Sequence, residues 1–406
     1  MSSLTNPYNV HIIKLENEYE IKKALTEIKV DKKAFDVLVP KMSFFHIKIE
    51  KVDTRAANII KQYLSSIGGE AAISKDAYYF TDRYTDIIIS ASKKNLLLLA
   101  QKISDGKYGL SEIAKEIDRN LRETNYLIKI GNKVFDFNQK TYIMGVLNLS
   151  FEDFKNNFSV KNLLKKIDPI IKSGADIIDI CSEIFYNKNY YDEIKEILPS
   201  LVSLIKSIKI EYPDIVVSIN TSKIEVAKEV FSAGVDLINQ SMPLKYNEEL
   251  IKLIAKNKYP VVLMYNSGLL NNNHHPKPLS SITEVLREIQ SNISYAISKG
   301  IDKDKIIIDP GVGFGKSEKD NLLILKQLSN FKIFNIPILV GLSKHNFLGE
   351  VIKGKIDSCL LSSITANILA IINGANILRI NGIEHILTIK KIIDTIKNNN
   401  LEYQDL

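Results

Sequence analysis

From residue 143 onward the chain alternates short apolar runs with longer amphipathic stretches. The apolar runs are rich in isoleucine, valine and leucine, and their apolarity is continuous rather than alternating. That pattern is typical of strands buried on both faces of a parallel sheet. We predict eight such strands, at residues 143–150, 176–181, 215–220, 237–241, 260–266, 305–311, 337–343 and 376–381.

The amphipathic stretches between these runs predict helices. The stretch 222–234 ends with the glycine expected just beyond a helix C-terminus. The segments KSGADIID, SAGVDLIN and INGANILR repeat the same order of helix end, glycine and strand. Eight strand-helix units in about 255 residues are what a (β/α)8 TIM barrel requires. A doubly wound open sheet is the alternative fold.

The N-terminal part of the chain has a different pattern. Residues 1–125 read as a small α/β or α+β module, to which the sequence assigns no role. Residues 126–142 predict a β-hairpin that turns at Gly131 and Asn132 and links the module to the bottom of the barrel. The barrel itself is expected at residues 143–400.

Composition narrows the class of protein. With 45% apolar and 25% charged residues, the 406-residue chain is ordinary for a globular protein. The net charge of +7 comes from scattered lysines, which argues against nucleic acid as a partner and is compatible with an anionic small substrate. The two cysteines fit neither a disulfide framework nor a zinc pattern. The apolar runs are too short to span a membrane, and no secretion signal is visible, so we expect a cytoplasmic protein.

The stretch IIIDPGVGFGKS, at residues 306–317, contains a glycine-rich loop. It is not a P-loop, because three residues rather than four separate Gly311 from Gly315, and a dinucleotide fingerprint would need glycine at Lys316. A buried strand that ends at Asp309 and continues into this loop predicts anion contacts from free N–H groups and Lys316. A plain turn from strand to helix is the alternative.

Polar side chains follow nearly every predicted strand. In barrel enzymes the chemistry sits at the C-terminal ends of the strands. Asparagine and aspartate also serve simple turns, but a full ring of such groups predicts a pocket for a planar, polar ligand that carries phosphate. The ring comprises Asn148, Asp179, Asn220, Asn239, Tyr265, Asn266, Asp309, Lys344, His345, Arg379 and Asn381.

The motifs at these strand ends resemble those of dihydropteroate synthases. YIMGVLNLS, IIDICSE, SINTSK, GVDLIN, VVLMYNSG, IDPGVGFGKS, VGLSKHNFLG and ILRINGI occur in the family's order, over residues 140–395. The resemblance implies condensation of 6-hydroxymethyl-7,8-dihydropterin diphosphate with p-aminobenzoate, which gives dihydropteroate and diphosphate in folate biosynthesis. The stretch YLSSIGGEAAISKDAYYFTD also resembles an N-terminal module of some bacterial members.

The resemblance implies roles for individual residues. Asp309, Asn239 and His345 are expected in catalysis, Asn148 is expected to help hold Mg²⁺ and diphosphate, and Asp179 is expected to support the pocket. Pairing with the pterin edge falls to Asn239 and Asp309. Arg379 is expected to bind a phosphate group. The expected substrate-binding residues are Asn220, Asn239, Asp309, Gly313, Phe314, Lys316, Lys344, His345, Arg379 and Asn381. A homodimer through the last two helices is also implied.

Several positions depart from the family pattern. Asn220 stands in place of an aspartate, Lys344 and His345 in place of an Arg-Lys pair, and Asn381 in place of a histidine. The loop SEIFYNKNYY has no arginine or proline. These changes leave two alternatives open: a methyltransferase-like domain that binds a reduced pterin, and a non-catalytic pterin-binding or partner paralogue. Retention of the diphosphate-handling positions favours the synthase; they are Asn148, Asp309, Lys316 and Arg379.

Overall fold

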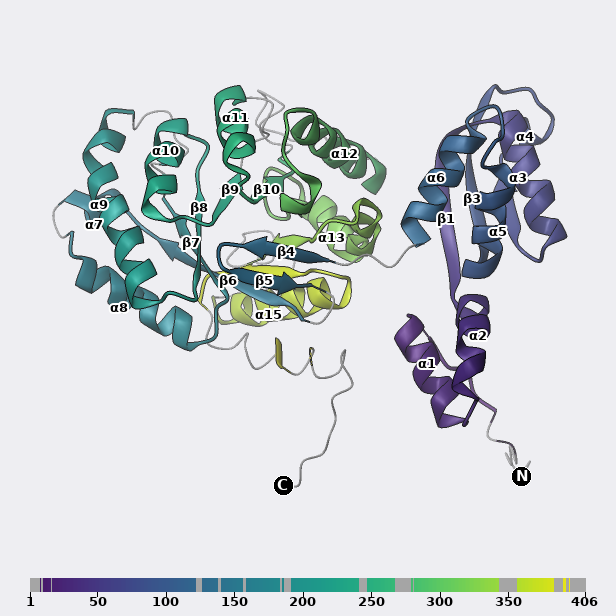
Figure 1. The fold of residues 1–406 in the computed structure, drawn as a ribbon, viewed down its shortest axis with the longest axis horizontal. Helices are drawn as coiled ribbons and strands as arrows, with labels where there is room; N and C mark the ends of the chain where they lie inside the picture. Colours follow the sequence, from purple (N-terminus) through teal and green to yellow (C-terminus); the bar gives the residue numbers. More distant parts are fainter. Residues whose placement is uncertain are drawn as a thin grey trace. The chain divides into compact units, whose positions relative to one another are not determined.

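The protein divides into two compact units, Met1–Glu123 and Thr124–Leu406 (Figure 1). The computed structural model describes residues 8, 10–15, 17–121, 126–137, 140–155, 158–182, 185, 191–240, 247–266, 279, 281–342, 356–382, 390, 391 and 394. Each unit has its own hydrophobic core. None of the helices in this part of the chain is long and apolar enough to cross a membrane.

The N-terminal unit is an α+β module. Its antiparallel sheet has the order β1-β3-β2, with β1 at Phe44–Asp53, β2 at Glu70–Ile73 and β3 at Tyr84–Ser92. Its helices are α1 (Glu18–Glu27), α2 (Phe35–Met42), α3 (Thr54–Ser66), α4 (Lys75–Tyr78), α5 (Lys93–Ile103) and α6 (Leu110–Leu121). Alternate residues of β3 are buried against α3, α5 and α6, where Ile60, Leu96 and Ile117 form part of the core. The expected small mixed module is confirmed.

The C-terminal unit is a closed barrel of parallel strands. The described residues form an eight-stranded sheet in the order β11-β10-β9-β8-β7-β6-β13-β12. Its ends meet at a parallel bridge between Ile308 and Ile338, where the Ile308 N–H donates to the Pro337 carbonyl at 2.9 Å. Because the sheet closes, the (β/α)8 prediction is confirmed and the open doubly wound alternative is excluded.

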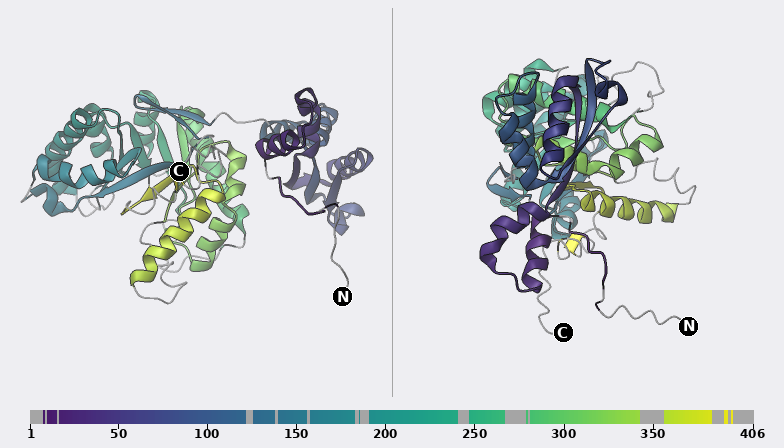
Figure 2. Two further views of the ribbon diagram at one scale, coloured as in Figure 1. Left: turned by 90° about the horizontal axis from the view of Figure 1, so that it is seen from below. Right: turned by 90° about the vertical axis from the view of Figure 1, so that its right-hand side faces the viewer.

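The strands fall where the apolar runs predicted them. They are β6 (Tyr142–Asn148), β7 (Ile177–Cys181), β8 (Val216–Asn220), β9 (Leu237–Gln240), β10 (Val261–Met264), β11 (Ile306–Asp309), β12 (Leu339–Gly341) and β13 (Ile377–Ile380). Helices lie outside the strands (Figures 1 and 2). They are α7 (Phe151–Lys155), α8 (Val160–Lys172), α9 (Tyr191–Glu211), α10 (Ile224–Ala233), α11 (Glu248–Asn257), α12 (Ile282–Ser298), α13 (Glu318–Lys326) and α15 (Ile356–Ile372).

Apolar side chains fill the N-terminal end of the barrel. The first inward-facing residue of each strand joins a cluster with a β-hairpin made of β4 (Leu127–Ile130) and β5 (Lys133–Asp136). The hairpin contributes Ile128, Ile130 and Phe135 to this cluster. Since this end is packed with apolar side chains, the polar groups that could meet a ligand lie toward the C-terminal ends of the strands.

The three repeated helix-glycine-strand joins share one hydrogen-bonding device. In each, a glycine with positive φ follows the helix. The Asp or Asn two residues after this glycine accepts a backbone N–H from another barrel strand or, in one case, from the residue that directly precedes that strand. The pairs are Asp176 with Ile143, Asp236 with Val217 and Asn376 with Ile338, each at 2.9 Å. The device ties neighbouring units of the barrel together and gives the repeated sequence motif a physical basis.

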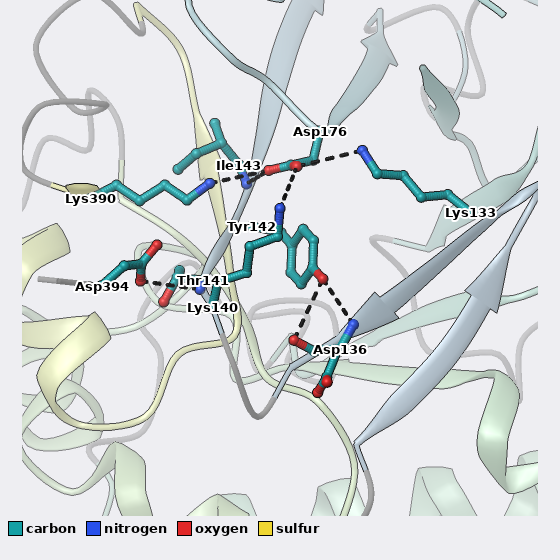
Figure 3. A network of polar contacts seen from close by, with 9 residues as sticks. All are labelled: Lys133, Asp136, Lys140, Thr141, Tyr142, Ile143, Asp176, Lys390 and Asp394. Carbon is teal, nitrogen blue, oxygen red and sulfur yellow. Dashed lines mark hydrogen bonds and ion pairs between the residues drawn. The ribbon is translucent and has the colours of Figure 1, made fainter. Parts of the chain in front are cut away.

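Asp176 also joins distant parts of the C-terminal unit (Figure 3). Its carboxylate lies 3.6 Å from Nζ of Lys133 in the hairpin, 3.6 Å from Nζ of Lys140 and 3.3 Å from Nζ of Lys390. Asp394, close to Lys390 in sequence, accepts the N–H of Thr141 at 3.3 Å. The hairpin, the first strand and the C-terminal segment are therefore linked at the N-terminal end of the barrel.

Candidate active site

A buried carboxylate organises the inner face of the barrel above the apolar layer. Asp179 is fully buried on β7 and accepts three hydrogen bonds from side chains on other strands. Ser218 Oγ donates to Oδ1 at 2.6 Å, while Asn239 Nδ2 at 3.1 Å and Arg379 Nε at 2.8 Å both donate to Oδ2. Asp179 thus fixes the orientation of Asn239 and Arg379, and the carbonyl oxygen of Asn239 faces away from this carboxylate.

Asp309 ends β11 on the same inner face. Its side chain is almost completely buried, and Oδ1 accepts the Gly311 N–H at 2.7 Å. Burial raises the pKa of Asp309 to about 6, although the Gly311 hydrogen bond and the positive charges of Lys316 and Arg379 act in the opposite direction. A carboxyl poised near neutrality in a barrel mouth is a functional-site candidate.

The glycine-rich loop after Asp309 folds tightly over the end of β10. Gly311 has φ of +65°, and a Cβ at this position would lie 1.8 Å from the carbonyl oxygen of Tyr265. Only glycine fits there. Lys316 Nζ donates to the carbonyl oxygens of Gly311 at 2.6 Å and Phe314 at 2.9 Å, and it lies 4.7 Å from the centroid of the Tyr265 ring. Burial lowers the pKa of Lys316 to about 8.

Three N–H groups of this loop are already used within the protein. Gly311 N donates to Asp309, Gly313 N donates to Asn321 Oδ1 at 2.7 Å, and Phe314 N donates to the Gly311 carbonyl at 3.1 Å. The expectation that the loop offers free N–H groups to an anion is therefore wrong for these three. Lys316 keeps one ammonium donor beyond its two carbonyl contacts.

Helix α13 begins directly after the loop and anchors it. Ser317 caps the helix, since its Oγ accepts the Asp320 N–H at 3.2 Å and donates to Asp320 Oδ2 at 2.7 Å. Asn321, one residue further along, is the residue that holds Gly313. The serine of the GKS sequence therefore has a structural role here.

A second ring of polar side chains lies at the mouth. Strand alternation places Cys181 and Asn220 two residues beyond Asp179 and Ser218, on the inner face. Asn220 is 9% exposed, and its Oδ1 is buried without a hydrogen-bond partner. Asn148 is exposed at the end of β6, and Asn381 is half-buried after β13.

Other predicted positions have different outcomes. Tyr265 points outward into the core between the strands and the helices, because its neighbour in sequence, Met264, occupies the inward-facing position. Lys344 and His345 lie outside the described residues.

Sequence reasoning missed Ser218 and Asn321. The period-two spacing of Ser218 before Asn220 was a usable signal, whereas nothing local marked Asn321 as the partner of the loop.

The fold and this site define the chain as a barrel protein with a cluster of polar and charged side chains at the C-terminal ends of its strands. The family model described as "Pterin binding enzyme" matches residues 144–381, more than half of the chain. The protein belongs to this family of pterin-binding enzymes.

Individual relatives agree with this membership. The chain is 31% identical over 251 residues to the dihydropteroate synthase of Clostridium beijerinckii, which covers 61% of this chain and 91% of that protein. It is 27% identical over 395 residues to a bifunctional dihydropteroate synthase/dihydropteroate reductase of Helicobacter pylori, which covers 95% of this chain and 99% of that protein. The crystal structure of a Clostridium difficile dihydropteroate synthase obtained in the presence of pteroic acid superimposes with a TM-score of 0.57. It is 30% identical and covers 64% of this chain and 98% of that chain.

Proposed function

We propose that this chain is a transferase of folate biosynthesis, a dihydropteroate synthase. It condenses 6-hydroxymethyl-7,8-dihydropterin diphosphate with p-aminobenzoate and releases dihydropteroate and diphosphate. One observation carries the proposal: Asp309 and the Asp179-ordered pair of Asn239 and Arg379 occupy one inner face of the barrel. This face lies within the region that matches dihydropteroate synthases over nearly their whole length.

Asp309 and Asn239 suit the recognition of a pterin. The amino-pyrimidine edge of a pterin presents adjacent N–H donors and a carbonyl acceptor. The ionised carboxylate of Asp309 accepts such donors, and the carbonyl oxygen of Asn239 accepts another. Because both groups are buried, a ligand lacking the matching donors would leave them unpaired at considerable cost. The pocket thereby selects for the pterin ring.

The same groups support the chemistry. In the reaction the bond between the pterin methylene and the diphosphate oxygen breaks, and the diphosphate leaves with the bonding electrons. The p-aminobenzoate nitrogen then forms the new C–N bond and loses a proton to solvent. Positive charge develops on the pterin, where the Asp309 carboxylate stabilises it, and negative charge develops on the diphosphate. Arg379 uses Nε for Asp179 and also reaches the Cys181 thiol, and its remaining N–H groups would serve that diphosphate. No covalent nucleophile is required.

The proposal includes Mg²⁺ at the mouth of the pocket. Among the described residues no group of three His, Cys, Asp or Glu side chains could hold a metal ion, and Asn148 offers one exposed amide oxygen. Such a sparse protein donor set fits Mg²⁺, which retains several waters and binds substrate phosphate oxygens. When bound there, Mg²⁺ would neutralise charge on the leaving diphosphate.

We extend the proposal to a cytoplasmic homodimer. Helix α15 exposes Leu361 (67%), Leu369 (48%) and Ile372 (60%), at a spacing that places them along one side of the helix. An apolar stripe of this kind suits contact with a second copy through the same helix. The free thiol of Cys181 is consistent with a reducing compartment.

The test combines calorimetry with turnover. The full chain is titrated with 6-hydroxymethyl-7,8-dihydropterin diphosphate and Mg²⁺, and p-aminobenzoate is then added while diphosphate release is followed. We expect binding and turnover, and Asp309→Ala is expected to abolish both. Asp304→Ala, a change at an exposed aspartate in the turn before β11, is the matched control and should retain both. Binding without turnover would identify a non-catalytic pterin-binding protein, and absence of binding would reject the pterin ligand.

A second candidate function concerns the whole chain. The Helicobacter pylori relative bears the names of both a synthase and a reductase, and its alignment covers 95% of this chain, including the N-terminal unit. The corresponding activity is reduction of dihydropteroate to tetrahydropteroate, in which a reduced nicotinamide or flavin transfers a hydride to the C=N bond of the pterin and solvent supplies the second proton. Oxidation of NADPH, NADH or reduced FMN that depends on added dihydropteroate would establish it. No oxidation with any of the three donors would reject it.

A further inference from the structure

Cys181 is a half-buried, free thiol at the end of β7. It follows Asp179 by two residues, and its Cα is paired with that of Asn148 on β6. The mechanism described above makes no use of this side chain. Its position among the residues expected to bind substrate raises the question of what it faces.

The hydrogen bond between Ser218 Oγ and Asp179 Oδ1 shows which face of the sheet the Cys181 side chain occupies. At 2.6 Å it requires both side chains to point to the same, inner face of adjacent strands. Residues two positions further along a strand point the same way. Ile180 pairs with Ile219 across β7 and β8, so the following residues, Cys181 and Asn220, are neighbours on the inner face, one level nearer the mouth.

Asn220 provides an independent indication that a ligand occupies this level. Its side chain is 9% exposed, and its Oδ1 is buried without a partner. An unsatisfied buried acceptor is costly, and a ligand N–H or O–H that reaches it removes that cost. Because Asn220 and the thiol are neighbours on this inner face, such a ligand would lie against Cys181.

We propose that the Cys181 thiol forms part of the wall of the substrate pocket and is a modification site at which small thiol-directed electrophiles block substrate binding. This inference rests on the proposed function for the identity of the substrate. The reagent must be small, because the thiol is partly buried. It should also be uncharged, because the thiol lies beside the charged side chains of Asp179 and Arg379.

Methyl methanethiosulfonate is a suitable probe. The Cys181 thiolate attacks the sulfenyl sulfur of the reagent, an S–S bond forms, and methanesulfinate leaves with the electron pair of the broken bond. The product carries only an added S-methyl group, and dithiothreitol reverses the reaction. Burial, helped by the Asp179 charge, raises the pKa of Cys181, while Arg379 acts in the opposite direction. The rate of modification should therefore increase as the pH rises from neutral to alkaline.

The first experiment measures modification of the native full-length protein by peptide mass spectrometry. The sequence contains one other cysteine, Cys359 on α15, whose modification is followed in the same samples. At 6-hydroxymethyl-7,8-dihydropterin diphosphate concentrations ten times the Kd, Cys181 should react about tenfold more slowly, because only the ligand-free fraction is exposed. The rate at Cys359 should not change. Equal rates at Cys181 with and without ligand would overturn the inference.

The second experiment compares turnover before and after treatment. Wild type and Cys359→Ala should lose activity in proportion to the modification of Cys181 and regain it with dithiothreitol. In Cys181→Ala the ratio of treated to untreated activity should stay near one, whatever its starting activity. If untreated enzyme turns over and full modification of Cys181 leaves turnover unchanged, the inference fails while the proposed function stands. If untreated protein neither binds the pterin diphosphate nor turns over, the proposed function fails, and this inference fails with it.

Discussion

Arg379 Nε lies 2.8 Å from Asp179 Oδ2, although 200 residues separate the two in sequence. Asp179 is fully buried, and the Arg379 side chain is 18% exposed. Removing water from two charges is costly, so such a pair is weak support for stability by itself. Its placement on the inner face of the barrel, next to Asn239, is better explained as orientation of a guanidinium that must meet an anion.

The first prediction concerns loss of Asp179. Asp179→Ala leaves a mostly buried guanidinium without its carboxylate and removes the acceptor of Ser218 and Asn239, so the free energy of unfolding should fall by about 3 kcal/mol. Urea denaturation measures this change. Affinity for the pterin diphosphate, measured by calorimetry on protein that remains folded, should also fall. Glu116→Ala, which removes an exposed pair with Arg119 on α6, is the control and should leave both quantities almost unchanged. Equal effects of the two substitutions would contradict the assigned role of Asp179.

The second prediction is a bell-shaped dependence of kcat/KM on pH. The pKa of Asp309 is raised to about 6 and that of Lys316 is lowered to about 8, so both groups are charged only between these values. kcat/KM should fall below about pH 6, as Asp309 takes up a proton, and above about pH 8, as Lys316 loses one. Lys316→Arg should remove the alkaline limb, since arginine stays charged. A profile that is flat between pH 5 and 9 would contradict the assignment of both groups.

The third prediction is that the contributions of Asp309 and Lys316 to the unfolding free energy change with pH in the direction opposite to kcat/KM. The folded state binds the Asp309 proton more tightly than the unfolded state does, so the contribution of this group to stability falls as pH rises from about 4 to 6. The unfolded state binds the Lys316 proton more tightly, so the contribution of that group rises from about pH 8 to 10. The difference in unfolding free energy between Asp309→Asn and wild type should therefore change with pH below 6 and be constant from 6 to 8. A difference that is constant down to pH 4 would mean that the pKa is not raised.

The fourth prediction concerns the glycine-rich loop. Gly311→Ala places a methyl group 1.8 Å from the Tyr265 carbonyl oxygen, so the loop must move and Asp309 must lose the Gly311 N–H. We expect a strong loss of both pterin affinity and stability. Gly234→Ala is the control: its φ is also positive, but the nearest atom to its Cβ is at 3.5 Å, so it should cost only about 1 kcal/mol and leave pterin affinity unchanged. Pterin affinity is measured by calorimetry and the unfolding free energy by urea denaturation for both variants. Gly234→Ala gives the cost of positive φ alone, and the additional loss in Gly311→Ala gives the cost of the clash with the Tyr265 carbonyl oxygen.

The fifth prediction tests the homodimer. Leu361→Glu combined with Leu369→Glu places two charges on the exposed apolar stripe of α15 and should convert a dimer to a monomer in sedimentation experiments. Ile297→Glu changes an exposed isoleucine on α12 and should leave the dimer intact. A wild-type protein that sediments as a monomer at micromolar concentration would reject this interface.

Sequence alone was sufficient for the fold and for much of the ring of polar residues. The apolar runs and the repeated glycine joins reflect local rules of strand burial and helix termination, so they can be read from neighbouring residues. The position of Asp309 at the end of β11 followed from the same reasoning, because a strand that ends in an acid and a glycine-rich loop has a local signature. The identity of the ligand came from the motif resemblance and not from these local rules.

The partners of these residues came only from the tertiary structure. The pairing of Asp179 with Arg379 and the capture of the Gly313 N–H by Asn321 depend on how distant segments meet when the barrel closes. The loop read from sequence as a set of free N–H donors proved to use three of them internally. The shifted pKa of Asp309 has the same origin, because burial and neighbouring charges are properties of the folded surroundings and not of the residue itself.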